Sequence, residues 1–329
     1  MIDIISNTKI YVMCPPQTAT GGPELLHQLV SKLTLMGFDA CMYYYPAKEN
    51  PVHENYVKYN CRFETTIDDS AEHLLVIPES LLFFTDNFKK IRKCIWWLSI
   101  DNLFKEYMAP KGYHIVKKLG WENLYRALIM NTKVKRKFDY HLAQSFYAID
   151  YLSKWDINAV YCSDYLNASF LSHSKDVNTI GKRQQVLYNP KKGIDFTKRI
   201  IEALPDVKWI PLIGLSPVEV SRLLSESMLY IDFGEHPGKD RFPREAAIFK
   251  CCVITGRRGS AAYAEDVSIP EQYKIEDNPV NISRIATLIK SCLAEYTDRV
   301  ADFATYREKI YNEESRFEAD LKSIFVKID

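Results

Sequence analysis

Short apolar runs that alternate with helical patterns are the feature that most limits how this chain can fold. In the first half, the runs at 9–14, 40–46, 73–78, 94–100 and 140–145 have the length and composition of buried strands. Between the first two runs, apolar residues recur at the spacing of one helical face: Leu25, Leu26, Leu29, Val30 and Leu33. Strands joined by crossover helices form parallel sheets, so the sequence predicts an α/β fold.

A shorter series of the same kind follows in the second half. The predicted strands lie at 184–189, 207–214, 228–234 and 251–256, with helical patterns near 194–204, 216–226 and 243–250. Two similar series predict two Rossmann-like domains.

The domain limits follow from a polar region, 166–183, that has no clear period and is the predicted linker. We predict an N-terminal domain over 1–170 and a C-terminal domain over 171–300. A C-terminal helix over 301–329 is expected to pack back towards the N-terminal domain.

Charge and cysteine content exclude several classes of protein. With 43 basic and 42 acidic residues the chain is nearly neutral, so bulk electrostatic capture of nucleic acid is not expected. None of the eight cysteines forms a Cys-x-x-Cys pair, and no signal peptide precedes the first strand, which is typical of a reduced cytoplasmic protein. No apolar run approaches the ~20 residues of a membrane span, so any membrane contact is peripheral.

No metal site is predicted. The seven histidines show no paired spacing, and the chain has no Asp-x-Asp motif. His27 within a helical pattern and His141 within a strand are interpreted as packed side chains.

Two glycine-containing loops follow predicted strands and precede helices. Gly21 and Gly22 allow a ligand to approach the backbone at a helix N-terminus, although a plain turn is the simpler alternative. Lys191 and Lys192 follow the strand at 184–189, at the strand end where open α/β sheets bind ligands. Ammonium groups there suit phosphates, whereas the alternative is a solvated basic loop.

The loop from Asp232 to Glu245 is the densest in ionisable residues. Lys239, Arg241 and Arg244, with the backbone at Gly238, could hold a diphosphate, because arginine binds phosphate oxygens in a bidentate way. Glu245 begins a predicted helix and could accept hydrogen bonds from two ribose hydroxyls. An ion-paired surface loop is the alternative.

A basic segment, 111–137, contains eight basic residues and a single acidic one, with interleaved aromatic and aliphatic side chains such as Trp121 and Tyr125. Such a helix can lie on an anionic membrane. The alternative is an amphipathic helix whose apolar side is buried in the domain.

The strand, charged loop and Glu-Ala-Ala helix ending at Ala247 resemble the donor-binding half of GT-B glycosyltransferases, and in particular the family-four-like retaining group found in bacterial surface-polysaccharide clusters. The resemblance implies two Rossmann-like domains facing a cleft. In that family two glutamates lie seven residues apart, and the second, which holds the donor ribose, would be Glu245. Glu235, two residues earlier than the family's first glutamate, and His236 are the candidate catalytic residues.

The resemblance implies a retaining, metal-independent transferase without a cofactor. It would move a sugar from a nucleotide diphosphate sugar to a glycan or lipid-linked acceptor in polysaccharide biosynthesis, in the cytoplasm and at the inner face of the membrane. The donor site would comprise Gly21, Gly22, Lys191, Lys192, Gly238, Lys239, Arg241, Arg244 and Glu245. Two alternatives stay open: a GT-B-type sugar-nucleotide epimerase and a non-catalytic sugar-nucleotide-binding subunit.

Overall fold

The computed structural model describes residues 1–107 and 115–328, which form two compact units. The first unit comprises Met1–Asp164 together with Arg316–Asp329, and the second comprises Tyr165–Ser315. The change of unit therefore falls a few residues before the predicted boundary at 170. The return to the first unit falls at Arg316 rather than at 301.

The first unit is built on a parallel sheet of seven strands in the order β4-β3-β2-β5-β6-β7-β8. The strands are β2 (Lys9–Cys14), β3 (Asp39–Tyr44), β4 (Phe63–Glu64), β5 (Leu74–Pro78), β6 (Arg92–Trp97), β7 (Tyr140–Ala143) and β8 (Val160–Tyr161). Taken in chain order, this is the 3-2-1-4-5-6 arrangement of a Rossmann sheet with one strand added. The order reverses between β2 and β5, which is where such sheets bind ligands.

Helices and short turns connect these strands. They are α1 (Gly21–Leu35), η1 (Glu54–Tyr59), η2 (Glu79–Asn87), α2 (Ile100–Tyr107), α4 (Glu122–Ile129), η3 (Met130–Val134) and α5 (Phe146–Ser153). The predicted apolar stripe of α1 is buried, because Leu26, Leu29 and Val30 are at most 1% exposed. The strand predicted at 94–100 ends at Trp97, since Ile100 already belongs to α2.

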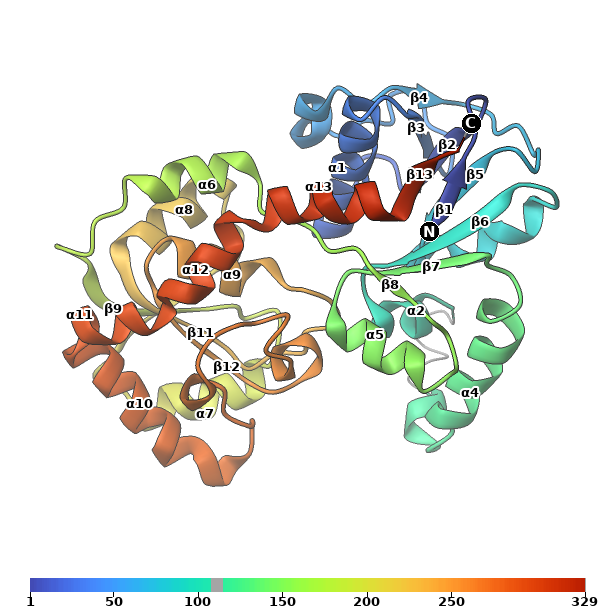
Figure 1. The fold of residues 1–329 in the computed structure, drawn as a ribbon. Coiled ribbons are helices and arrows are strands. Elements are labelled where there is room, and N and C mark those ends of the chain that lie inside the picture. The colour runs from blue at the N-terminus through green and yellow to red at the C-terminus, as the bar shows by residue number, and fades with distance from the viewer. Residues whose placement is uncertain (108–114, 329) are drawn as a thin grey trace. The chain divides into compact units, whose positions relative to one another are not determined.

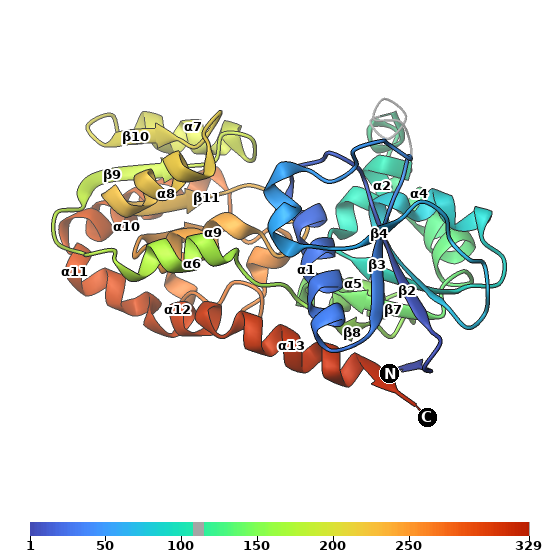
Figure 2. The same ribbon diagram turned by 90° about the horizontal axis from the view of Figure 1, so that it is seen from above.

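The two ends of the chain meet in the first unit. Strand β1 (Ile2–Ile4) pairs in parallel with β13 (Phe325–Lys327), which follows α13 (Glu313–Ile324). Figure 1 shows this red strand beside the blue one, and Figure 2 shows the N- and C-termini close together. On α13, Phe317 stacks on Trp96 of β6 with ring centroids 6.3 Å apart, which packs the end of the helix onto the first sheet.

The second unit contains a four-stranded parallel sheet in the order β10-β9-β11-β12. The strands are β9 (Arg183–Tyr188), β10 (Lys208–Pro211), β11 (Ser227–Asp232) and β12 (Cys252–Thr255). The order reverses between β9 and β11. Around the sheet lie α6 (Ala168–Lys175), α7 (Ile194–Ala203), α8 (Pro217–Glu226), α9 (Arg241–Ile248), α10 (Ile282–Ala294), α11 (Tyr296–Arg299) and α12 (Ala304–Tyr311).

The region predicted as a linker is instead partly helical. In α6, Asn167 caps the first turn by accepting a hydrogen bond from the Ser169 N–H at 3.0 Å, and Phe170 is buried in the core of the second unit. One apolar anchor in a polar stretch gives too weak a period to be seen in the sequence. The predicted α/β fold with two Rossmann-like sheets is confirmed.

Candidate functional site

The candidate site lies where the strand order of the second sheet reverses. Loop 189–193 follows β9, and loop 233–240 follows β11, so both leave the carboxyl edge at the reversal point. The two loops pack directly against each other: a Cβ added to Gly193 would lie 2.3 Å from the Phe233 carbonyl oxygen, and one added to Gly234 would lie 2.2 Å from Cβ of Lys192. Gly193 also has a positive φ of 59°, which suits glycine. The glycines are therefore needed for this close approach.

The two predicted lysines on loop 189–193 differ in their surroundings. Lys191 is exposed, and its N–H donates to the Asn189 side chain at 3.0 Å. Lys192 is half-buried, and its Nζ lies 2.5 Å from Oδ2 of Asp240 on the other loop. Both precede the N-terminus of α7, whose free N–H groups favour an anion.

His236 lies between two carboxylates and has no exposed surface. Its Nε2 is 3.5 Å from Oδ1 of Asp232, and its Nδ1 is 3.2 Å from Oδ2 of Asp240. Neither contact has the geometry of an aligned hydrogen bond. Burial lowers the pKa of His236, but the two carboxylates outweigh it and raise that pKa above its usual value.

Asp232 is held by further partners. It accepts hydrogen bonds from the Tyr230 hydroxyl at 2.8 Å and from the Gly234 N–H at 2.9 Å. Burial raises the pKa of Asp232, whereas His236 and these donors lower it, so that the net pKa lies below the usual range.

Asp232, His236 and Asp240 place their ligand atoms within 4.8 Å of one another, a spacing that could hold a metal ion. Tyr230 and Gly234 already donate to Asp232, and the ammonium of Lys192 already pairs with Asp240. A raised pKa favours a protonated His236, which is a cation and not a metal ligand. The donors present thus fit an internal ion-pair network better than a metal.

Lys239 and Arg244 converge on one carboxylate, that of Glu313 at the start of α13. The Lys239 Nζ–Oε1 distance is 2.7 Å, and the Arg244 Nη1–Oε2 distance is 2.8 Å. Arg244 has no exposed surface and also donates to the Lys239 carbonyl at 3.2 Å. These two predicted donor ligands are therefore partnered within the protein, by a glutamate that nothing in the sequence links to the loop.

Glu245 is buried and Arg241 is half-buried beside it. Arg241 Nε donates to Oε1 of Glu245 at 3.1 Å, one helical turn along α9.

Glu235, the other predicted catalytic residue, is exposed. Gly238 accepts a hydrogen bond from the Ser260 hydroxyl at 2.7 Å.

The loop after β12 supports the loop after β11 from behind. Ser260 N–H donates to the His236 carbonyl at 2.9 Å. Gly259 has a φ of 57°, and a Cβ added there would lie 2.0 Å from the same carbonyl oxygen. Loop 256–260 therefore holds loop 233–240 of the candidate site in place.

In the first unit, Gly21 and Gly22 begin α1 after β2, beside the reversal point of that sheet. A Cβ at Gly22 would meet only Leu98, at an ordinary 3.6 Å. Packing within the protein therefore leaves room for a side chain at Gly22.

The predicted packed histidines are confirmed in the same unit. His27 lies 2.8 Å from the Tyr44 hydroxyl, and burial lowers its pKa. His141 accepts a hydrogen bond from Trp97 Nε1 at 3.3 Å, and burial lowers its pKa to about 4.

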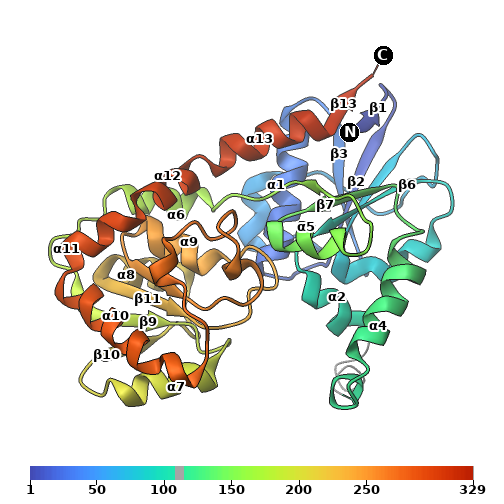
Figure 3. The ribbon, with the colours of Figure 1, turned by 60° about the horizontal axis from the view of Figure 1, so that its bottom comes forward.

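The basic segment presents both a buried and an exposed apolar face. Tyr125 and Ile129 of α4 are buried in the first unit. Trp121, Leu124 and Leu128 are 61%, 71% and 59% exposed, and Ile115 and Leu119 are exposed as well. In Figure 3, α4 lies at the edge of the first unit. Lys111 and Tyr113 lie outside the described residues.

No model of a known protein family and no curated protein matches this sequence. Solved structures match over nearly the whole chain. Sucrose-phosphate synthase from Thermosynechococcus elongatus has 12% identity and a TM-score of 0.67, covering 97% of this chain and 98% of its own. HepE from Anabaena, solved with UDP, has 10% identity and a TM-score of 0.62 over 96% and 99%.

A glycosyltransferase from Rickettsia africae has 12% identity and a TM-score of 0.59, with 97% of each chain covered. The structural neighbours are GT-B glycosyltransferases, mostly of the retaining family-four type. The two Rossmann-like units of this chain together have the GT-B fold.

Proposed function

We propose that this protein is a glycosyltransferase that takes a sugar from a nucleotide diphosphate sugar. The observation that supports this most strongly is the pair of glycine-dependent loops at the reversal point of the second sheet, with Lys191 and Lys192 beside the N-terminus of α7. Such a place in an open α/β sheet is where ligands bind, and this one offers positive charge and free N–H groups. HepE, a neighbour of the same fold, was solved with UDP.

The departing group of the reaction is a nucleoside diphosphate, whose developing charge must be stabilised. In this proposal Lys191 and Lys192 bind the diphosphate together with the α7 N-terminus, and Asp240 holds Lys192 in place until the donor arrives. Because these groups supply positive charge, no metal is needed. We propose a retaining, metal-independent reaction without a cofactor, and activity that persists in excess EDTA is the expected result.

Glu245 is the proposed acceptor of ribose hydrogen bonds, and Arg241 pairs with its carboxylate. The exposed Glu235 is the proposed catalytic carboxylate, while Gly21 and Gly22 of the first unit are proposed to approach the donor phosphates. The backbone of Gly238, in loop 233–240, is also proposed to contact the donor diphosphate.

His236, Lys239 and Arg244 are positioning residues in this proposal. Each side chain is at least nine-tenths buried and pairs with carboxylates of the protein. Together they fix the course of the loop that presents Glu235 and leads into Glu245.

The proposed acceptor is a glycan or a lipid-linked glycan, reached at the inner face of the membrane. Trp121, Leu124 and Leu128 form an exposed apolar face on α4, and exposed cations lie nearby at Lys117, Lys118, Lys135 and Arg136. An apolar face with Trp and flanking cations complements an anionic membrane surface, where each cation contributes ~1 kcal/mol. None of the described helices has both the length and the apolar character of a transmembrane span. Salt-sensitive co-sedimentation with anionic vesicles is expected, whereas retention by a DNA duplex without vesicle binding would identify nucleic acid as the partner instead.

The donor proposal is tested by titration with UDP, UDP-glucose and uridine, followed by thermal unfolding. A ligand at 100 times its dissociation constant stabilises the fold by ~2.7 kcal/mol. Lys192→Met is expected to lower the affinity for UDP more than the affinity for uridine. The matched control is Lys175→Met, which replaces an exposed lysine on α6. An equal loss of affinity for UDP and uridine would contradict a role of Lys192 at the diphosphate.

Product analysis separates the three functions that the sequence left open. Slow release of glucose from UDP-glucose supports a transferase. An epimerised sugar nucleotide would support the epimerase, and binding without any turnover would support a non-catalytic subunit.

A further inference from the structure

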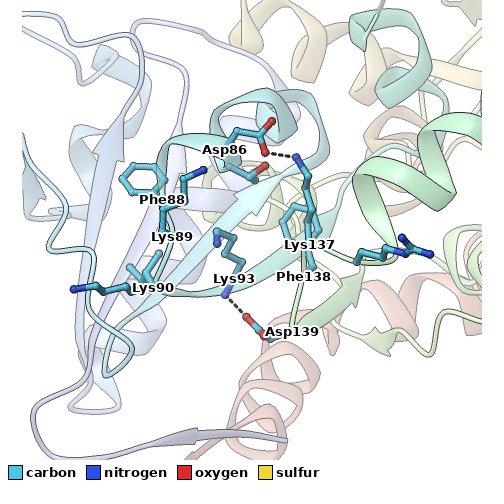
Figure 4. Close-up of a pocket in the computed structure, with 11 residues that line it drawn as sticks. Asp86, Phe88, Lys89, Lys90, Lys93, Lys137, Phe138 and Asp139 are labelled. Carbon is cyan, nitrogen blue, oxygen red and sulfur yellow. Dashed lines mark hydrogen bonds and ion pairs between the residues drawn. The ribbon is translucent and has the colours of Figure 1, made fainter.

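A pocket of about 370 Å³ opens in the first unit at the amino edge of its sheet (Figure 4). Its lining comes from the end of η2, the residues that lead into β6, and the residues that lead into β7. Open α/β sheets bind their substrates at the opposite, carboxyl edge, where Gly21 and Gly22 lie. The pocket is therefore separate from the donor loops and has no part in the function proposed for them.

The pocket has an apolar floor and a cationic rim. The floor is formed by Phe88, Ile91 and Phe138, which pack against the core of the first unit. Five cationic and two anionic side chains line it in total, and the cations are Lys89, Lys90, Lys93, Arg136 and Lys137. Figure 4 shows the Lys90 side chain extending away from the others.

Both acidic side chains that line the pocket already have hydrogen-bond or ion-pair partners within the protein. Asp139 accepts a hydrogen bond from the backbone N–H of Lys93 at 2.7 Å, and Asp86 pairs with Lys137 and, at 3.7 Å, with Lys133. Among the described residues, the ammonium groups of Lys89 and Lys93 have no ion-pair partner. The carboxylates of Asp86 and Asp69 attract Lys89 and Lys93, respectively, but form no ion pair with them, so both ammonium groups are available to an anion in the pocket.

The rim is also fixed before any ligand arrives. Asp69, outside the pocket, accepts hydrogen bonds from the backbone N–H groups of Lys89, Lys90 and Ile91 at 2.9, 3.0 and 2.9 Å. These bonds lower the pKa of Asp69 despite the opposing effect of burial. A pre-organised loop loses less conformational entropy when an anion binds.

The pocket is continuous with the segment proposed to contact the membrane. Helix α4 runs directly into η3, and Lys133 of η3 pairs with Asp86 at the rim. Arg136 and Lys137 follow within three residues of the end of η3 at Val134. The exposed apolar face of α4 and the cationic pocket therefore lie on one short stretch of chain.

We propose that this pocket binds the phosphate of an anionic lipid headgroup. Lysine and arginine recognise phosphate oxygens through charge-assisted hydrogen bonds, and a volume of about 370 Å³ lies in the range of about 300–1,000 Å³ typical of small-ligand pockets. The apolar floor suits the glycerol carbons of such a headgroup. This inference rests on the membrane contact proposed above and names the lipid chemistry that the contact recognises.

The first arm of the test uses a soluble phosphate ester and needs no membrane. Glycerol 3-phosphate and inorganic phosphate are titrated into the full chain, and glycerol serves as the uncharged control. The amide resonances of Lys93 and Asp139 report on the pocket. The double variant Lys89→Gln/Lys93→Gln is expected to lower the affinity for glycerol 3-phosphate and for inorganic phosphate at least tenfold. The matched control Lys48→Gln/Lys175→Gln removes two exposed charges elsewhere and is expected to change affinity less than twofold.

The second arm compares vesicles of phosphatidylglycerol with vesicles made equally anionic by oleate. Wild type is expected to prefer the phosphate headgroup, and Lys89→Gln/Lys93→Gln is expected to lose that preference while retaining the binding common to both vesicles. Leu124→Ser, on the apolar face, is expected to weaken binding to both kinds of vesicle and to leave the affinity for glycerol 3-phosphate unchanged.

The outcomes separate the two proposals. Absence of phosphate binding, or equal binding by wild type and Lys89→Gln/Lys93→Gln, overturns the pocket even if vesicles bind. Phosphate binding that depends on these lysines, without any preference among vesicles, overturns the lipid source and assigns the pocket to a soluble phosphate ester. A chain that binds no vesicle but retains lysine-dependent phosphate binding contradicts the proposed membrane contact, and with it the lipid source, while the donor site of the second unit is unaffected.

Discussion

Two regions of this molecule are rich in charge, and they use it in opposite ways. In the second unit, His236, Lys239 and Arg244 are buried, and each faces a carboxylate of the same unit. In the first unit, Lys89, Lys117 and Arg136 are exposed. A run of ionisable residues in a sequence therefore indicates either an internal scaffold or an open binding surface, and burial decides which.

The physical consequence differs as well. A buried charge has lost its hydration, so removal of its partner is costly. An exposed charge keeps its water and contributes little to stability, but it acts on ligands at the surface. Five substitutions test this contrast, from the largest expected effect to the smallest.

The largest effect is expected from Glu313→Gln. This change removes the carboxylate that the buried Lys239 and Arg244 share, and removing one partner of a buried ion pair costs about 3–5 kcal/mol. The free energy of unfolding in denaturant measures the loss. Glu308→Gln, an exposed glutamate on α12, is the control and should stay within about 0.5 kcal/mol of wild type. Similar values for the two variants would show that the buried pairs do not support the loop.

Glu245→Ala is expected to act mainly on nucleotide binding. A hydrogen bond to a charged group is worth about 1.5–3 kcal/mol, so UDP affinity should fall more than tenfold. Calorimetry with UDP and with inorganic diphosphate checks the role, because only the ligand with a ribose should be affected. Unchanged UDP affinity in a folded variant would remove Glu245 from the ribose site.

Gly259→Ala tests whether loop 256–260 holds loop 233–240 in place. A side chain there meets a positive φ and the His236 carbonyl at 2.0 Å, and backbone strain of this kind costs about 1–3 kcal/mol. Gly256→Ala is the matched control, since its new Cβ would find its nearest neighbour at 3.5 Å. Equal melting temperatures for the two variants would contradict the close packing of these loops.

His236→Gln should change how stability depends on pH. Since the pKa of His236 is raised on folding, its contribution is complete below the unfolded value of about 6.5 and is lost as pH rises through the folded value. Wild type should therefore lose more unfolding free energy than His236→Gln between about pH 6 and 9. His141→Gln is the control of opposite sign: burial lowers the pKa of His141 to about 4, so wild type should gain unfolding free energy relative to His141→Gln as pH rises from about 6 through the unfolded value of about 6.5. Parallel curves for wild type and His236→Gln would show that folding does not shift the pKa of His236, and the opposite slope would show that the fold keeps the imidazole neutral.

Leu124→Ser is expected to leave the free energy of unfolding within about 0.5 kcal/mol of wild type, because the side chain is 71% exposed. Binding to anionic vesicles should nevertheless fall about tenfold, since burying a leucine is worth about 1.5–3 kcal/mol. Leu35→Ser, at the end of α1, removes another leucine that is 77% exposed and should leave vesicle binding intact. An equal effect of the two substitutions would argue against a specific membrane face.

Local patterns predicted much of this fold. The apolar run at 9–14 coincides with β2, and the runs at 184–189 and 251–256 coincide with β9 and β12 to within one residue at each end. Buried parallel strands are continuous apolar runs, so each is visible in its own sequence. Strand β13 was not predicted, because three residues that pair with β1 more than 300 positions away have no local signal.

The candidate site was predicted only as far as its loops. Strand ends and glycines indicated Lys191, Lys192 and Glu245, whereas Glu313 was missed because a buried partner 69 residues from Arg244 leaves no mark on local sequence. Charge counting also could not distinguish Arg244, which has no exposed surface, from the half-buried Arg241 three residues before it.

The pairing of β1 with β13 has a consequence for how the protein is made. Residues 316–327 are synthesised only after the whole second unit, yet they belong to the first. Domains generally fold in the order in which they leave the ribosome. Here the second unit, continuous in sequence, is able to finish folding while the first still lacks one strand and the packing of Phe317 on Trp96. A nascent chain therefore passes through a stage in which its earlier-made half is the incomplete one, with the backbone of β1 open to a wrong partner.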